Sequence, residues 1–264
     1  MAQELRFALY AIKKNIQSSA ELRTSFLMNV VGMAINNTAF IILWVFFVKS
    51  VGVIGGWTAA DIVGLQGFAA LSYGVIFSTA MGIRKLPEYV ASGAFDRFML
   101  SPKNLLLRVA TSSFNASAVG DTIFGIVCLI TYGFLIHVTA YQILVMAILA
   151  ILAIIVFLAL MIAIYSTSFF FIDSNAVTSG LFELFLTPSL FHGGAFQGAM
   201  RFIFTFLIPS LLIGALPVEA VRDVSLAKLA LIGVLALVWF FVSLSIFKKA
   251  TRKYESSNFM TFGS

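Results

Sequence analysis

The residues that most often do chemistry are few and far apart in this chain. It has one cysteine, Cys128, and two histidines, His137 and His192. One cysteine cannot build a disulfide framework, and a metal site needs three or four convergent ligands. The sequence also lacks a Gly-Lys dipeptide, a Gly-x-Ser-x-Gly elbow and a His-Glu-x-x-His motif. We therefore predict no catalytic residues, metal or bound cofactor in this chain, and expect Cys128 to be a small core residue.

One acidic residue is notable for its apolar surroundings. Asp121 falls about midway along a predicted membrane span at 106–134. A charge at that depth costs at least about 2.5 kcal/mol, so such residues usually face protein or water. Ser112, Ala116 and Gly120 recur every four residues on the same span and predict a face for close packing. Asp121 either belongs to a polar path or dimer seam, or is a structural acid hydrogen-bonded to its neighbours.

The composition predicts the environment of these residues. The chain of 264 residues is 61% hydrophobic and only 11% charged, whereas a soluble domain carries roughly 25% charge. This apolar surface is more than one soluble core can bury, so we predict an all-α integral membrane protein. The net charge of +6 fits orientation in a membrane rather than binding of nucleic acid, because the basic residues adjoin apolar stretches.

Six stretches are long enough to cross a bilayer as helices, since each span needs about 20 apolar residues. The first contains Asn29, Asn36 and Asn37, which we expect to face other helices because lipid cannot satisfy an amide. The second is rich in small residues, which let helices approach closely. Within one domain covering 1–264, we place the spans at about 25–48, 61–83, 106–134, 141–170, 174–192 and 227–247.

The fifth span is the least regular of the six. Residues 173–217 are apolar but interrupted by glycine, proline and charged residues. Either 174–192 crosses and 198–216 forms re-entrant or external helices, or 198–216 is the crossing. Broken helices at membrane depth need protein or water to cover their free backbone groups. Glu183 lies in the first of these segments, and we expect it within the bundle as a candidate for the same path or seam as Asp121.

The amino terminus and the basic residues predict the orientation. Residues 3–22 have the spacing of an amphipathic helix lying in the headgroup plane, without an apolar core of signal-peptide length. With six crossings, 13 of the 17 basic residues fall on one side, which places both termini in the cytoplasm. The 13 residues are Arg6, Lys13, Lys14, Arg23, Arg84, Lys85, Arg97, Lys103, Arg108, Lys248, Lys249, Arg252 and Lys253.

The cytoplasmic loop 84–105 mixes charged residues with large apolar ones. This mixture suits docking into a groove on a soluble partner. The alternative is a basic loop that only fixes orientation. The candidate docking residues are Arg84, Lys85, Glu88, Tyr89, Phe95, Asp96, Arg97, Phe98 and Leu100.

Part of this loop resembles a stretch of the permease subunits of type 2 ABC exporters, a bacterial six-span family. The sequence Ser-Gly-Ala-Phe-Asp-Arg-Phe-Met-Leu-Ser-Pro at 92–102 carries a Gly, an Asp, a Leu and a Pro at similar places. The order of elements along the whole chain is also similar, including the proline-broken segment before the last span. The matching positions are Gly93, Asp96, Leu100 and Pro102.

The resemblance implies that two permease chains, identical or related, pair in the bacterial cytoplasmic membrane above two copies of a separate ABC ATPase. ATP and Mg²⁺ would bind to that partner, and the loop 84–105 would pass its closure to the spans. Membrane lipids, but no nucleic acid, would contact the chain. The cargo stays open, because lipids, peptides, antibiotics and glycans all pass through related permeases. An ion-coupled secondary transporter and a non-transport assembly protein or lipid-modifying enzyme remain alternatives.

Overall fold

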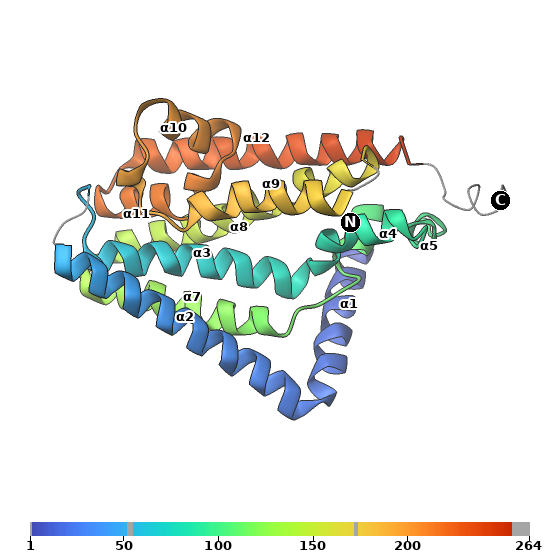
Figure 1. Cartoon of the computed structure of the whole chain (residues 1–264), viewed down its shortest axis with the longest axis horizontal. Coiled ribbons are helices and arrows are strands. Elements are labelled where there is room, and N and C mark those ends of the chain that lie inside the picture. Colours follow the sequence, from blue (N-terminus) through green and yellow to red (C-terminus); the bar gives the residue numbers. More distant parts are fainter. Residues whose placement is uncertain (1, 52–54, 172–173, 255–264) are drawn as a thin grey trace.

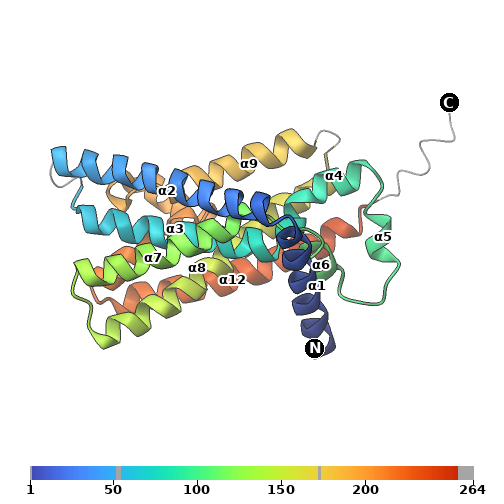
Figure 2. The same ribbon diagram turned by 90° about the horizontal axis from the view of Figure 1, so that it is seen from below.

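The computed structural model describes residues 2–51, 55–171 and 174–254, and every regular element in these residues is a helix. Most helices run lengthwise through one bundle, and α1 (Ala2–Glu21) lies across one end of it (Figures 1 and 2). We call the end that carries residues 81–110 the platform end. The opposite end, which carries α11 (Ala215–Arg222), is the ion-pair end.

Five helices in the described residues are long and apolar enough to cross a membrane. They overlap the first four predicted spans and the last one, and they confirm an all-helical membrane protein. The helices are α2 (Arg23–Val51), α3 (Ala59–Thr79), α7 (Ser117–Leu135), α8 (Ala140–Ser166) and α12 (Leu226–Thr251).

The predicted fifth span forms a helix that is too short to join this group. Helix α9 (Ser174–Ser189) has 16 residues, which corresponds to a rise of about 24 Å, against the roughly 30 Å of a bilayer core. It nevertheless runs along the bundle (Figure 1). The chain leaves α8 at the platform end and must reach the ion-pair end, where α12 begins. The chain therefore returns along the bundle in α9, although five helices, not six, have the length of a span.

The third predicted span needs a correction, because the chain is not one helix over 106–134. A short helix, α6 (Leu105–Ala110), is followed by six irregular residues before α7 begins. Asn115 Oδ1 accepts hydrogen bonds from the backbone N–H of Ser117 at 3.1 Å and from its hydroxyl at 2.8 Å. Local side-chain bonds of this kind compete with helix formation. Asp121 is therefore near the start of α7 rather than midway along a span.

The same break removes the predicted packing face. Ser112 lies in the irregular segment and Ala116 is only the N-cap of α7, so neither shares a helix face with Gly120. Close packing is found instead between α3 and α7. A Cβ on Gly74 would lie 2.4 Å from the backbone N of Thr122, and one on Gly125 would lie 2.4 Å from that of Leu71. The small residues of α3 thus permit close approach as expected.

The segment between α9 and α12 is broken into short pieces. It contains α10 (Gly198–Phe202), a π-helical turn at Ile203–Leu207 and a 3-10 turn at Ser210–Leu212 before α11 begins. The indole N–H of Trp239 in α12 donates to the carbonyl of Phe206 at 3.2 Å. Protein thus covers a free backbone group of this broken stretch, as membrane depth requires.

Candidate functional site

The platform, residues 81–110, is a compact unit rather than an extended loop. A 3-10 turn at Met81–Lys85 leads into α4 (Leu86–Ala91), followed by α5 (Asp96–Met99) and α6. Gly93 has φ of 70°, a conformation that glycine adopts without strain, and it turns the chain from α4 into α5. The N–H of Phe95 then donates to the carbonyl of Tyr89 at 2.9 Å and closes the turn.

Three of the predicted docking residues form the base of the platform and are buried. Phe95 packs edge-on against Phe169, with ring centroids 5.0 Å apart, and Phe98 is also buried. The hydroxyl of Tyr89 lies 3.0 Å from Ser112 Oγ. These aromatic side chains face the bundle, so they anchor the platform and are not available to a partner's groove.

Arginine side chains hold the platform together from outside. The guanidinium of Arg97 lies over the rings of Tyr89 and Phe98, at 5.1 and 4.9 Å from their centroids. Arg108 donates to the carbonyl of Phe98 and, at 3.3 Å, to that of Arg97. Arg84 lies over the rings of Phe77 and Phe182 on α3 and α9. Such contacts contribute about 0.5–1 kcal/mol each at exposed sites.

The tip of the platform exposes two large apolar side chains. Leu100 is 86% exposed and Met99 is 52% exposed, and the neighbouring predicted residues Glu88 and Arg97 are exposed as well. Lys85 and Asp96 are half-buried. Met99 is not among the predicted docking residues. The sequence does not show which of the neighbours Phe98 and Met99 is buried in the bundle and which is exposed.

Helix α1 and the platform share contacts. The carboxylate of Glu4 accepts a hydrogen bond from the N–H of Asn104 at 3.2 Å, and the ammonium of Lys103 lies 4.2 Å from the centre of the Phe7 ring. Farther along α1, the amide of Asn15 donates to the carbonyl of Thr111 at 2.8 Å. The two elements therefore form one continuous surface at this end of the bundle.

A cavity of about 280 Å³ that contains several polar side chains lies between α2, α3, α7 and α9. Asp121 lines it and is 3% exposed; its Oδ1 accepts a hydrogen bond from the Asn37 amide at 2.6 Å. The other carboxylate oxygen, Oδ2, is buried without a hydrogen-bond partner, and so is Nε2 of Gln66, which is 5% exposed and lines the same cavity. Nothing in the sequence distinguishes Gln66 from other polar residues of the spans.

The remaining residues of the predicted path or seam are not gathered around Asp121. A Cβ on Gly120 would lie 2.4 Å from the carbonyl oxygen of Val30, so Gly120 serves packing between α7 and α2 of this chain. Glu183 is exposed on α9 and does not line the cavity, which corrects the expectation that it lies within the bundle. Ser112 and Ala116 lie before α7, as described above.

The ion-pair end holds a chain of alternating charges. Glu219 Oε2 lies 2.7 Å from Arg201 Nη2 and 3.2 Å from Lys228 Nζ, and both Glu219 and Asp61 are buried. Lys228 also pairs with Asp223 at 2.5 Å, and Arg222 pairs with both Asp223 and Asp61 at 3.3 Å.

These pairs join the start of α3 to α10, α11 and the start of α12. Burial alone would raise the pKa of the Asp223 carboxyl, but hydrogen bonds from Lys228 and Arg222 hold it below its usual value. In the sequence, Arg201, Arg222 and Lys228 are simply three of the four basic residues left on the second side, with Lys49. Their partners come from distant segments, so spacing could not reveal the network.

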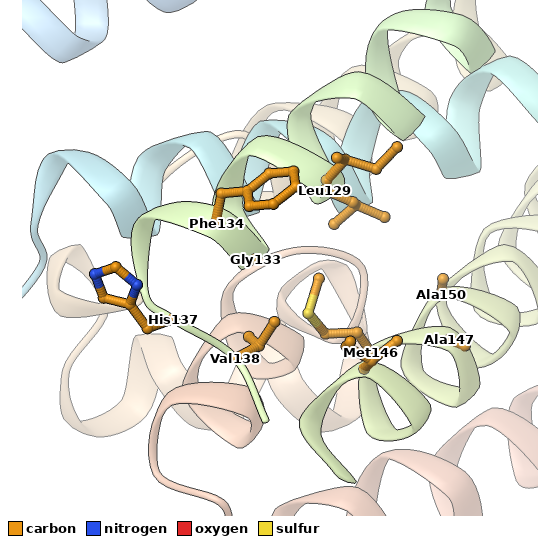
Figure 3. A pocket seen from close by; sticks show the side chains of 10 residues that line it. Leu129, Gly133, Phe134, His137, Val138, Met146, Ala147 and Ala150 are labelled. Atoms are coloured by element: carbon orange, nitrogen blue, oxygen red, sulfur yellow. The ribbon is translucent and has the colours of Figure 1, made fainter. Parts of the chain in front are cut away.

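The largest cavity described, about 630 Å³, is a cleft between α7 and α8 near their connection (Figure 3). Apart from His137 on the turn, its lining is apolar, and it includes Leu129, Phe134 and Met146. It lacks the convergent polar groups that give a ligand site its specificity. In the described residues no group of three or more His, Cys, Asp or Glu is placed to hold a metal ion.

Comparison with known protein families matches the chain over residues 34–258 to the ABC-2 family transporter protein. A comparison with curated proteins found no match. The family match covers the later part of α2 and the other four candidate spans. It agrees with a helical membrane chain that has no nucleotide-binding loop in its sequence, because in this family ATP hydrolysis belongs to another component. The chain therefore belongs to the ABC-2 transporter family and is the multi-pass membrane permease of an ABC transporter.

Proposed function

We propose that the chain is the permease subunit of an ATP-driven exporter, that it works as a dimer in the bacterial cytoplasmic membrane, and that it is coupled to two copies of a separate ATPase through the platform. The exposed tip of the platform carries this proposal. Leu100 is 86% exposed beside Met99, on a base held by buried rings. Large apolar side chains presented to water on a rigid support are typical of interface anchors.

The orientation follows from charge and connectivity. The platform, α1 and the basic end of α12, with Lys248 and Lys249, all lie at one end of the bundle. By the positive-inside rule this end faces the cytoplasm, where a soluble ATPase would bind. Six crossings, with α9 as a short fifth span, keep both termini on that side. Leu9 and Ile16 are exposed on α1, which suits a helix lying in the headgroup plane.

An exposed helix supports pairing with a second permease chain. None of the most apolar window of α2 is buried in this chain. Asn29 on α2 is exposed, and its amide donates only to the Ser25 carbonyl of the same helix, at 2.8 Å. Lipid offers an amide no hydrogen-bond partner, whereas a neighbouring helix does. We therefore place the dimer contact along α2, within reach of the platform.

The platform has a direct route by which ATPase closure reaches the spans. Force on Leu100 would pass to α5 and, through Phe95, to Phe169 at the end of α8. Arg84 connects the start of the platform to rings on α3 and α9. The chain thus contributes the moving helices and the pathway, and the ATPase supplies the energy of ATP hydrolysis.

Docking through the platform is tested by changing an exposed residue of its tip while leaving the buried aromatic base unchanged. Leu100→Asp should reduce co-purification of the ATPase with the full-length chain by about tenfold or more, since an interface anchor contributes about 2 kcal/mol. Leu226→Asp is the matched control, because Leu226 is 66% exposed at the opposite end of the bundle. Both variants should give the same yield of monodisperse protein in detergent. Equal ATPase recovery with the two variants would show that the platform is not the docking surface.

A second measurement tests ATP-driven export itself. Vesicles containing the permease and its ATPase should move cargo only when ATP is supplied on the side that faces the platform. Depleting ATP while keeping an ion gradient should stop transport. Transport that continues under those conditions, or that survives loss of the ATPase, would instead identify an ion-coupled transporter or a protein that acts without an ATPase.

A further inference from the structure

The cavity around Asp121 contains a buried acid without a cation. Asp121 is 3% exposed, and among the described residues its carboxylate accepts a hydrogen bond from the neutral amide of Asn37 alone. No lysine or arginine is among the described residues that line the cavity. A carboxylate in a low-dielectric site is costly unless it is paired with positive charge and hydrogen-bond donors. The free oxygen, Oδ2, is therefore suited to a cationic donor brought by a ligand.

A second buried atom without a hydrogen-bond partner, Nε2 of Gln66, narrows the class of ligand that would fit the cavity. Gln66 lines the same cavity, is 5% exposed, and has its Nε2 donor unsatisfied. Leaving such a group unpaired costs about 1–3 kcal/mol. An ammonium group has donors only, so it would satisfy Asp121 but not Gln66. Gly67 of α3 packs against Leu129 of α7 and Gly74 against Thr122, which places Gln66 more than two helical turns from Asp121 along the pair. A ligand that satisfies both residues therefore needs an oxygen acceptor well separated from its ammonium group.

Apart from Asn36, Asn37 and Tyr73, the rest of the lining is apolar and indicates a ligand with a hydrocarbon portion. Met33, Phe40, Leu186 and Leu190 line the cavity together with two alanines, and Phe40 is 40% exposed at its edge. A few placed polar groups in an apolar lining are typical of small-molecule sites. An alkyl chain can leave this site past Phe40, where the cavity opens to the surface of the chain.

We propose that this cavity binds an amphipathic amine, with its ammonium group on Asp121 and an oxygen acceptor farther along the molecule on Gln66. As a cargo site it rests on the proposed export function, but binding itself requires neither ATP nor the ATPase. The chemistry is shared by free amphipathic amines and by the headgroups of aminolipids.

The test measures binding to the full-length chain in phosphatidylcholine nanodiscs. The probes are decylamine, decanol and an amino alcohol of the same chain length whose hydroxyl lies several carbons from its amine. We expect the amino alcohol to bind tightest and decanol weakest. Asp121→Asn should weaken binding of both amines by about tenfold or more, as expected for a charge-assisted hydrogen bond, and leave decanol unchanged. Gln66→Leu should remove the preference for the amino alcohol over decylamine.

Thr131→Val is the matched control, because Thr131 is exposed on the same helix as Asp121 and lies outside the cavity. It should bind all three probes as the parent does. Decanol binding as tightly as decylamine, or Asp121→Asn binding amines like the parent, would overturn the proposal.

A photoreactive form of the amino alcohol provides a test on the unmodified chain, which does not depend on the folding of any variant. It should label peptides that contain Phe40 or Leu186. Labelling confined to the cleft between α7 and α8 would overturn the proposal. Adding phosphatidylethanolamine to the nanodiscs distinguishes an aminolipid from a free amine as the ligand. If the lipid competes with the probe, the site binds an aminolipid headgroup; if it does not, the site binds a free amine.

This outcome can be separated from that of the docking test. Loss of amine binding would leave ATPase co-purification unchanged, and failure of the ATPase to bind would leave the amine site intact.

Discussion

The chain buries acidic side chains in two regions and satisfies them in opposite ways. At the ion-pair end, Asp61 and Glu219 are 1% and 5% exposed, and each lies within 3.3 Å of a cationic nitrogen. In the cavity, Asp121 is 3% exposed and has only a neutral amide donor. The paired acids stabilise contacts between helices, whereas the acid without a cation can still bind a cationic ligand. Burial alone therefore does not distinguish structure from function; the partners do.

The largest expected effect comes from removing a cation at the ion-pair end. Arg222→Leu leaves the Asp61 carboxylate buried without its cation, and should lower the free energy of unfolding by about 2–3 kcal/mol. An SDS titration of the purified chain measures this change. Adding Asp61→Asn in the same chain should recover about half of the loss or more, because the uncompensated charge is gone. A double variant no more stable than Arg222→Leu would show that the loss of stability does not come from the unpaired Asp61 carboxylate.

The next effect has the opposite sign and concerns the cavity. Gln66→Leu removes a buried donor that has no partner and should raise the free energy of unfolding by about 1 kcal/mol. The same SDS titration applies, with Thr131→Val as the control for replacing a polar side chain. A clear loss of stability in Gln66→Leu would mean that the amide is already satisfied within the fold.

Asp121→Asn should change stability less than either of these variants. The asparagine can still accept from Asn37, and no cation loses a partner, so the change should stay under about 1 kcal/mol. If this variant were as unstable as Arg222→Leu, Asp121 would be a structural acid and the contrast between the two regions would fail.

The smallest effect is a loss of stability in acid at the ion-pair end. The pKa of Asp223 is held below its ordinary value of 3.8 by Lys228 and Arg222. Its contribution is therefore present above about pH 4 and disappears as the pH falls through the lowered pKa. The change should be small because the Asp223 side chain is 41% exposed and water screens the pairs.

Thermal unfolding of the parent and of Asp223→Asn between about pH 6 and about pH 3 measures this contribution. The variant should lose less stability over that range than the parent. Equal losses would mean that the pairs of Asp223 do not stabilise the fold.

Composition and hydropathy were sufficient to predict a helical membrane protein, because the bilayer imposes length and apolarity on every span. They failed at 111–116, where Asn115 bonds to its own neighbourhood and ends a helix that hydropathy alone would continue. They also failed to predict the length of α9. Hydropathy averages over about 19 residues, so one local hydrogen bond is invisible to it.

The candidate sites were predictable only in part, for a different reason. The motif at 92–102 directed attention to the platform, but the sequence could not tell that Phe98 is buried and Leu100 exposed. Asp121 was recognisable because a charge in an apolar run is costly. Gln66 was not, since its importance comes from a cavity shared by four helices. Which side chains face one another is decided by packing between segments that are distant in sequence.

The contact between α3 and α7 limits how this gene can vary. At Gly74 and Gly125 even a methyl group would lie 2.4 Å from a backbone nitrogen of the facing helix, and backbone cannot move aside as a flexible side chain can. In a saturation library, both positions should tolerate glycine alone. Substitutions in the two helices are therefore coupled. Recombination that exchanges α3 or α7 without the other would join helix surfaces that are not complementary.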